Sequence, residues 1–265
     1  MNKKYNNDLA LIGAGYWGKN LARVFNQLGV LNTLCDTNDS ILEKNSSLYP
    51  NLNIETDYNK VLNNPKIKRI AISAPAEYHY RLARKALESN KDVFVEKPLC
   101  LKVHDCEDLI ELAKIKGNIL MVGHLLQYHP CIEAINNFIK DGSIGQLFYI
   151  SSSRLNLGKI RTEENALWSF APHDISVMLG LVGNKMPLSL SCNGGDYITP
   201  GIVDTTMTTI NFSDGVRAHI YVSWLNPFKE QKLTVIGSEA MIVFDDTKPI
   251  EEKLTLYPNY LKINS

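Results

Sequence analysis

The sequence predicts an α/β protein of two domains, with a doubly wound parallel sheet in residues 1–125 and an α+β domain on a mainly antiparallel open sheet in residues 126–265. In the first half, short apolar runs alternate with amphipathic helical stretches. After Val122 the pattern changes to longer strands joined by hairpin turns. The length of 265 residues suits two domains of ordinary size.

Five short apolar runs in the first half have the character of buried strands. One helix face follows the first run and ends at Gly29, and further helices are centred near Leu82 and Ile110. Continuous apolar strands alternating with helices imply a parallel sheet covered on both faces. The runs are DLALIG (8–13), LNTLCD (31–36), RIAISAP (69–75), DVFVEKP (92–98) and NILMVGH (118–124).

The second half begins with a helix predicted over residues 130–140, followed by the strand GQLFYISSSRL (145–155). Residues 205–224 read as a hairpin about the Asp214-Gly215 turn, and residues 231–246 as another about Gly237-Ser238. The open face of this sheet is expected to be apolar on strands such as RAHIYVSW.

The stretch NALWSFAPHDISVMLG (165–180) interrupts these strands with an apolar helix that reads clearly from Ile175 onward. Pro172 suits the first helical position, and Asp174 in the first turn would complement the helix dipole. On that reading His173 is incidental. The alternative is that His173, held at a rigid helix start, acts as an acid or base in a cleft.

Composition limits the possible functions. With 28 basic and 28 acidic residues the formal charge is zero, which argues against a nucleic-acid partner. No run approaches the roughly 20 apolar residues of a membrane span, and no signal peptide is visible, so we expect a cytoplasmic protein with no membrane partner. Five cysteines without a C-x-x-C pair suggest neither disulfides nor zinc. The spacing of His124, His129 and His219 matches no ligand pattern, so no metal is predicted.

The motif Gly13-x-Gly15-x-x-Gly18 lies between the first strand and the first helix, as in the dinucleotide-binding Rossmann fold. There the first glycine permits a tight turn, the second admits a pyrophosphate and the third allows close helix packing. Asp36 ends the second strand, where a carboxylate would bind ribose hydroxyls and repel a 2′-phosphate. NAD is therefore favoured over NADP, although a simple turn or N-cap role for Asp36 stays open.

Lys97 ends another strand of the sheet, in DVFVEKPLC. Ligands of such sheets bind beyond the carboxyl ends of the strands, so Lys97 would face the nicotinamide end of a cofactor. Partial burial beside a positive ring would lower its pKa from about 10.4 toward neutrality. The alternative is that Lys97 is a surface lysine after a strand. Pro98 makes this alternative less favourable because it stiffens the turn, to which a cis peptide bond could contribute.

Six segments in order resemble the Gfo/Idh/MocA oxidoreductases: GAGYWG, SAPAEYHYRLARKAL, VEKPL, GHLLQYHP, APHDI and VIGSEAMIVFDD. Within the family the chain looks most like the bacterial UDP-N-acetylglucosamine and UDP-N-acetylglucosaminuronate 3-dehydrogenases of surface-polysaccharide, including lipopolysaccharide, synthesis. The resemblance implies that Lys97 and His173 are catalytic and that Glu96 contacts the nicotinamide ribose. The remaining implied cofactor residues are Tyr16, Trp17, Ser73, Pro75 and His79. The resemblance also implies a homodimer or homotetramer formed through the second sheet.

Two departures from the family pattern bear on activity. Many relatives carry an aspartate four positions before the histidine, where this chain has Ser169. Serine can orient a neighbour by hydrogen bonding but supplies no charge to raise a histidine pKa. Relatives also usually continue past the second hairpin, so the C-terminus is expected to be shortened.

A loop rich in basic residues precedes the PHD triplet and is the candidate substrate-binding region. Arg154, Lys159 and Arg161 could bind the carboxylate or phosphate oxygens of a nucleotide-linked sugar. A solvated loop with Glu163 and Glu164 as counter-ions explains them equally well. Trp168 could stack on a sugar or uracil ring, although an aromatic beside an apolar helix is more often core. Asn165 and Ser169 complete the predicted set.

The sequence as a whole predicts an NAD-dependent dehydrogenase that removes hydride from a ring carbon, C3 in the first instance, of a nucleotide-linked sugar. Two alternatives stay open at this point. One is an NADPH-dependent keto-sugar reductase, against which Asp36 argues. The other is a dinucleotide-binding regulatory protein without catalysis, which the presence of Lys97 and His173 disfavours and which Ser169 and the short end leave open.

Overall fold

The computed structural model describes residues 5–158, 160–162 and 164–259, and Lys159 and Glu163 lie outside them. The chain divides into two compact units, Met1–Gly123 and His124–Ser265. Each unit is described by itself.

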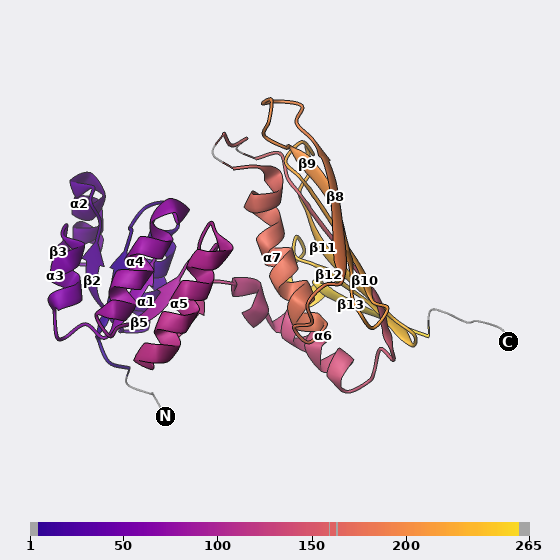
Figure 1. Ribbon diagram of the computed structural model, residues 1–265, viewed down its shortest axis with the longest axis horizontal. Coiled ribbons are helices and arrows are strands. Elements are labelled where there is room, and N and C mark those ends of the chain that lie inside the picture. Colours follow the sequence, from indigo (N-terminus) through magenta and orange to yellow (C-terminus); the bar gives the residue numbers. More distant parts are fainter. Residues whose placement is uncertain (1–4, 159, 163, 260–265) are drawn as a thin grey trace. The chain divides into compact units, whose positions relative to one another are not determined.

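The N-terminal unit, coloured indigo to magenta in Figure 1, contains a parallel sheet. This sheet has six strands in the order β3-β2-β1-β4-β5-β6. This order, with the reversal between β1 and β4, is that of a doubly wound sheet and confirms the predicted fold class. The strands are β1 (Leu9–Ile12), β2 (Leu31–Cys35), β3 (Asn53–Glu55), β4 (Arg69–Ile72), β5 (Asp92–Val95) and β6 (Leu120–Val122).

Helices cover both faces of this sheet and thereby bury its strands on both sides. Successive residues of β1 illustrate this arrangement: Leu9 and Leu11 pack in one apolar cluster, while Ala10 and Ile12 pack in another. The first cluster includes residues of α1 and α2, and the second includes residues of α3, α4 and α5. The helices are α1 (Gly18–Gln27), α2 (Asp39–Leu48), α3 (Tyr58–Asn63), α4 (Ala76–Glu88) and α5 (Val103–Lys116).

The elements α2, β3 and α3 were not predicted. In α2 (DSILEKNSSL) only Leu42 and Asn45 are buried, so the apolar periodicity is too weak to recognise. Side-chain caps begin both helices: Asn38 accepts hydrogen bonds from the backbone of α2, and Asp57 accepts one from Asn59 of α3. These capping residues were the available signal.

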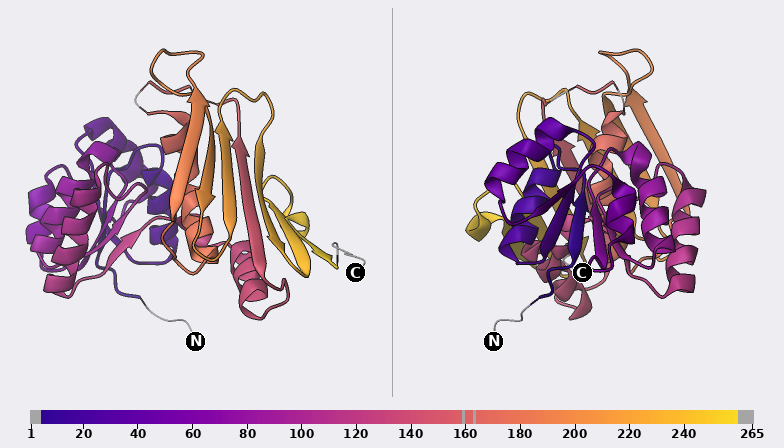
Figure 2. Two further views of the ribbon diagram at one scale, coloured as in Figure 1. Left: turned by 45° about the vertical axis from the view of Figure 1, so that its right-hand side comes forward. Right: turned by 90° about the vertical axis from the view of Figure 1, so that its left-hand side faces the viewer.

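The C-terminal unit contains a seven-stranded sheet in the order β13-β12-β11-β7-β10-β9-β8, which Figure 2 shows in its left-hand view. Only β7 and β10 pair in parallel, and all other neighbours are antiparallel. Both predicted hairpins, β9–β10 and β11–β12, are present. The strands are β7 (Leu147–Leu155), β8 (Ser189–Gly195), β9 (Thr205–Asn211), β10 (Arg217–Ser223), β11 (Glu230–Gly237), β12 (Ala240–Asp245) and β13 (Leu254–Pro258).

Two α-helices, α6 (Pro130–Lys140) and α7 (Ala166–Leu181), lie on one face of this sheet (Figure 1). The bounds of α6 agree with the prediction. The core between helices and sheet includes Ile135, Met178, Ile220 and Trp224. Short 3₁₀ turns lie at η1 (Leu125–Tyr128) and η2 (Ile250–Glu252).

The predicted start of α7 is wrong. The helix begins at Ala166, with Asn165 as its N-cap, and Pro172 lies inside it. Asp174 is therefore in the middle of α7 and buried, and it does not serve as a first-turn dipole partner. Pro172 was expected at the helix start because a proline suits the first helical position; inside the helix it removes one backbone hydrogen bond. The Asn165 cap nucleates a turn before the proline and makes the longer helix possible.

The expectation of an apolar open face on RAHIYVSW is also wrong. Ala218, Ile220 and Val222 of β10 are buried in the core. The residues alternating with them, Arg217, His219 and Tyr221, are exposed or half-buried and point to the other face. That face is mixed in character. In the described part of the chain, no helix is long and apolar enough to span a membrane.

Candidate active site

The glycine loop after β1 has the geometry that the motif predicts. Gly13 has φ +90°, and a Cβ there would lie 2.7 Å from the Ala74 nitrogen. A Cβ on Gly18 would lie 2.1 Å from the Gly13 carbonyl oxygen. The fold itself therefore requires both glycines. A Cβ on Gly15 would meet no described atom within 4 Å, so Gly15 leaves free space where a pyrophosphate would approach the backbone.

Asp36, at the carboxyl end of β2, supports this loop. Its Oδ2 accepts a hydrogen bond from the Ala14 backbone N–H at 2.7 Å, and its Oδ1 accepts one from the Asn38 N–H at 2.9 Å. The second contact is the turn role considered as an alternative. A carboxylate has about four acceptor sites, so Asp36 can hold both N–H groups and still receive ribose hydroxyls.

Ser73 and His79 join the loops that follow the neighbouring strands. The Ser73 hydroxyl donates to the Gly13 carbonyl oxygen at 2.7 Å. His79 is buried, with Nδ1 2.7 Å from the Pro98 oxygen and Nε2 2.8 Å from the Ala74 oxygen. Pro75 stands at the N-cap of α4. These residues tie together the loops after β1, β4 and β5, which form one edge of the sheet.

Glu96 and Lys97 follow β5 at the same edge. Burial raises the pKa of Glu96, although the Trp17 side chain and the Lys97 backbone hydrogen-bond to its carboxylate and act in the opposite direction. Lys97 is half-buried, and its bond to Pro98 is cis. Tyr16, also from the glycine loop, is largely exposed with the Lys19 ammonium 5.1 Å from its ring centre.

The start of α7 carries three predicted substrate residues. Asn165 accepts a hydrogen bond from the Trp168 N–H at 3.0 Å through its side chain, so its visible role is to cap the helix. The Trp168 side chain is 47% exposed, which excludes the alternative that it is core. Ser169 is buried one turn before His173, which is half-buried.

A groove of about 510 Å³ runs along the exposed side of α7. This volume is within the range of ligand sites, and no Lys, Arg, Asp or Glu is found among the described residues that line it. Most of its wall is apolar. The lining residues are His124, Gln127, Leu167, Trp168, Pro172, Ile175, Ser176, Leu179 and Asn184.

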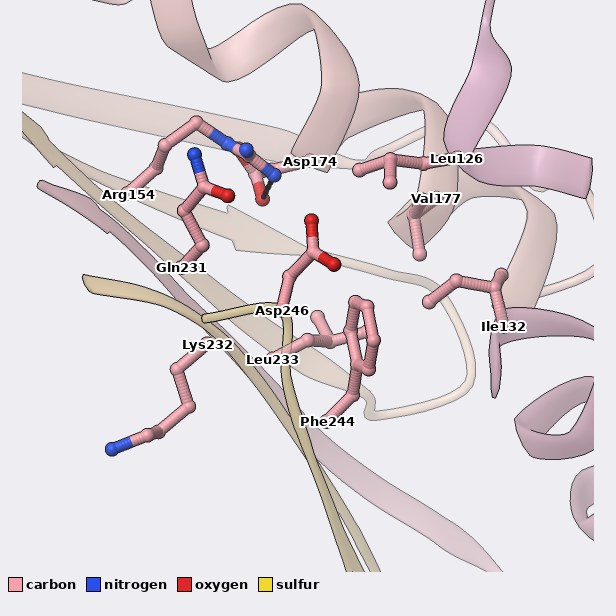
Figure 3. Close-up of a pocket in the computed structure, with 10 residues that line it drawn as sticks. All are labelled: Leu126, Ile132, Arg154, Asp174, Val177, Gln231, Lys232, Leu233, Phe244 and Asp246. Atoms are coloured by element: carbon pink, nitrogen blue, oxygen red, sulfur yellow. Dashed lines mark hydrogen bonds and ion pairs between the residues drawn. The ribbon is translucent and has the colours of Figure 1, made fainter. Parts of the chain in front are cut away.

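The basic residues predicted to bind substrate anions already have carboxylate partners. Arg154 donates to both oxygens of Asp174, from Nε at 2.7 Å and from Nη2 at 3.1 Å. Figure 3 shows this pair beside a small cavity. Arg161 pairs with Glu164 at 2.6 Å, as the solvated-loop alternative proposed, and keeps 43% of its side chain exposed. Lys159 and Glu163 lie outside the described residues.

The polar groups that hold α7 were not predicted from the sequence. Ser152 donates to Asp174 Oδ1 at 2.5 Å, and the Gln127 amide donates to the Ser176 carbonyl oxygen at 2.5 Å. Ser152 and Arg154 alternate with Ser151 and Ser153 along β7, so they point to the helix-covered face. Polar residues at inward positions of a strand were the available signal. Within the described ranges, no three His, Cys, Asp or Glu residues are grouped to hold a metal ion.

Comparison with known families accounts for most of the chain. Residues 8–124 match a family described as oxidoreductases with an NAD-binding Rossmann fold. Residues 132–243 match the GFO/IDH/MocA C-terminal domain. The N-terminal unit is therefore an NAD-binding Rossmann domain, in agreement with the free space at Gly15 and the carboxylate of Asp36.

Individual relatives have different activities. A 2,7-anhydro-N-acetylneuraminate hydratase of Mediterraneibacter gnavus is 23% identical over 89% of this chain, which spans 66% of that relative's length. A candidate oxidoreductase of Magnetospirillum magnetotacticum MS-1 is 32% identical, with a TM-score of 0.86 over 98% of this chain and 83% of its own. The UDP-N-acetylglucosamine 3-dehydrogenase of Acidithiobacillus ferrooxidans shares the fold, with a TM-score of 0.86, 19% identity and coverage of 96% of this chain and 81% of its own.

Proposed function

The chain belongs to the Gfo/Idh/MocA oxidoreductases, and from that premise we propose that it is an NAD-dependent dehydrogenase acting on C3 of a UDP-linked N-acetylated hexose or hexuronate. The observation that carries the proposal is the joining of the loops after β1, β2, β4 and β5 at one edge of the N-terminal sheet. There the free space at Gly15, the Asp36 carboxylate and Lys97 follow strands β1, β2 and β5. Such an edge is where ligands of doubly wound sheets bind.

The proposed chemistry assigns two side chains to one substrate hydroxyl. When bound, NAD supplies the acceptor for the hydride that leaves the ring carbon. Lys97 donates a hydrogen bond to the reacting hydroxyl and orients it, and His173 takes the hydroxyl proton. General base catalysis of this kind contributes a factor of about 10² to 10⁴.

Ser169 distinguishes this site from that of the many relatives with an aspartate four positions before the histidine. The side chain one turn before His173 is a buried hydroxyl, which is neutral at every working pH. It can fix a neighbouring group by hydrogen bonding but does not stabilise an imidazolium by charge. We therefore propose that residue 169 supplies no charge to this proton transfer.

The substrate assignment rests on the groove along α7 and on Arg161. Trp168 offers an exposed indole for stacking on a sugar or uracil ring. Arg161 keeps part of its guanidinium exposed beside Glu164 and is our candidate for the diphosphate. The UDP-N-acetylglucosamine 3-dehydrogenase supports this substrate class through its shared fold. A place in surface-polysaccharide synthesis belongs to the same proposal.

The hydratase relatives favour one alternative, a lyase-type reaction on an N-acetylated sugar. The addition of water leaves no net change in the cofactor, whereas dehydrogenation produces one NADH for each sugar oxidised. The regulatory alternative predicts binding without any turnover. A reductase would prefer NADPH, which the Asp36 carboxylate disfavours.

The test is incubation of the protein with NAD and a panel of UDP-sugars, while the absorbance of reduced nicotinamide is followed. We expect absorbance to rise with an N-acetylated hexose or hexuronate. Lys97→Ala is expected to abolish the rise while NAD still binds. Lys102→Ala, an exposed lysine after the same turn, is the matched control and should keep the parent rate. Tight NAD binding without turnover of any sugar would favour the regulator.

Self-association through the second sheet is a further part of the proposal. The exposed face of this sheet carries Tyr149 and His219, whose ring centres lie 5.3 Å apart, among polar side chains. Mixed faces of this kind occur in stable interfaces, which are only about as apolar as the rest of a protein surface. Sedimentation measurements would distinguish a homodimer or homotetramer from a monomer.

A further inference from the structure

We propose that Arg154 is a positioning residue, which fixes the orientation of His173 through a buried clamp on Asp174 and does not bind a substrate anion. The proposal rests on the catalytic role proposed for His173. It concerns a different question, namely what holds that side chain in place in the middle of an apolar helix.

The first step is the weakness of α7 at this point. Pro172 has no N–H, so the Trp168 carbonyl oxygen receives no helix hydrogen bond from residue 172. Helices bend most readily at such positions. His173 comes directly after the proline, and the backbone ladder alone therefore fixes its direction less firmly than that of other residues in α7.

The second step is a set of hydrogen bonds, called the clamp, that holds Asp174, the residue directly after His173. Asp174 receives two hydrogen bonds from Arg154 and one from Ser152, and Asp174 is only 5% exposed. Arg154 and Ser152 both belong to β7, a central strand of the second sheet. A two-pronged guanidinium contact fixes direction as well as distance. The clamp therefore sets the rotation of α7 against the sheet at residue 174 (Figure 3).

The third step is a contact on the other side of the histidine. The Gln127 amide donates to Ser176 at its carbonyl oxygen, and it packs so closely on α7 that a Cβ on Gly180 would lie 3.0 Å from it. Consecutive helix residues are about 100° apart, so His173 lies about 60° from Ser176 and, in the opposite direction, about 100° from Asp174. On the helix surface, His173 therefore lies between residues 174 and 176, each of which is held by a side chain from outside α7.

The fourth step is the state of the Arg154 charge. Its side chain is only 13% exposed, and its partner carboxylate is 6% exposed. Asp174 holds the Nε–H and one Nη2–H of Arg154, and moving these two donors to a substrate phosphate would leave a buried carboxylate uncompensated. Arg161, which keeps 43% of its side chain exposed, has no such obstacle.

The test compares Arg154→Met with Lys185→Met, which removes an exposed cation paired with Asp214 in the same unit. His173 is observed directly by NMR in protein labelled at histidine, with its signal assigned by His173→Gln. We expect R154M to shift or broaden this signal and to lower kcat about tenfold or more, because small misplacements of a catalytic group are costly. KM and the affinities for NAD and UDP should stay within about twofold. K185M should change none of them.

Two results would overturn the proposal. One is an unchanged His173 signal in R154M; the other is a tenfold loss of UDP or substrate affinity with kcat preserved, which would make Arg154 an anion ligand. If R154M does not fold, Arg154→Lys keeps the charge but loses the two-pronged contact, and it should shift the same signal by a smaller amount. If the parent oxidises no sugar, the proposed function fails, while the His173 signal still decides the question of the clamp.

Discussion

In the N-terminal unit the candidate site is shaped by a loop whose backbone path only glycines permit, whereas in the C-terminal unit it is shaped by buried side chains that hold a helix. The glycine loop is held by contacts such as the Ser73 hydroxyl on the Gly13 carbonyl. Helix α7 is held by Arg154, Ser152 and Gln127. A backbone site depends on glycines at fixed spacing, which a single sequence displays. A side-chain site depends on partners that meet only after folding.

Two substitutions in the glycine loop test whether the N-terminal site depends on its backbone path. Gly18→Ala places a Cβ 2.1 Å from the Gly13 oxygen and should lower the free energy of unfolding by about 3 kcal/mol or more. Gly15→Ala meets free space and should leave stability unchanged, while weakening NAD binding about tenfold or more. Thermal unfolding and calorimetry measure the two. Equal losses of stability would contradict the division of roles.

The second prediction concerns a side-chain anchor of the C-terminal unit. The buried Asp204 carboxylate accepts hydrogen bonds from the Trp224 indole at 2.5 Å and from the Tyr197 N–H at 2.6 Å. Asp204→Asn turns an amide group toward one of these donors, and it should cost about 2 to 3 kcal/mol at pH 7. Denaturant unfolding measures this cost.

The pH dependence of that cost has a definite sign. Burial raises the pKa of Asp204, but the hydrogen bonds from Trp224, Ile198 and Tyr197 outweigh it and lower the pKa below the ordinary 3.8. The carboxylate therefore stabilises the fold above pH 3.8 and loses this effect as the pH falls through the lowered pKa. A difference between parent and variant that grows in acid would contradict the assignment.

The third prediction separates the two roles of Asp36. Asp36→Ala removes the acceptor for the Ala14 N–H and should cost about 1 kcal/mol of stability. It should also weaken NAD binding about tenfold while improving the relative affinity for NADP, since the charge that repels a 2′-phosphate is gone. Calorimetric titration with both cofactors measures this preference. An unchanged preference would leave Asp36 with the turn role alone.

The smallest effect comes from Glu96. Burial raises its pKa above the ordinary 4.5, so the charged form is less favourable in the fold than in the unfolded chain. Glu96 therefore contributes most to the free energy of unfolding below pH 4.5, and this contribution declines as the pH rises through the raised pKa. Glu96→Gln should therefore stabilise the cofactor-free protein at pH 7 by less than about 1 kcal/mol, and by nothing near pH 4. A destabilised variant at pH 7 would contradict this.

The difference between the two units also explains which of their features the sequence predicts. Alternating apolar runs identified five of the six strands of the N-terminal sheet, and the glycine spacing identified the cofactor loop, because both are local patterns. The short strand β3 has two exposed residues, and no pattern marked it. The partner of Arg154 was missed because Asp174 is 20 residues away in the sequence. Pro172 misled the helix assignment because the Asn165 cap outweighs its local preference.

The proposed transfer of hydride from C3 of a UDP-linked N-acetylated sugar to NAD can be followed with a deuterium label. The substrate is UDP-N-acetylglucosamine, or the corresponding uronate, deuterated at C3, and the mass of the reduced cofactor is measured. We expect NADH that is one mass unit heavier and carries the substrate deuterium. Reduced cofactor without deuterium, or a converted sugar with no reduced cofactor, would contradict it.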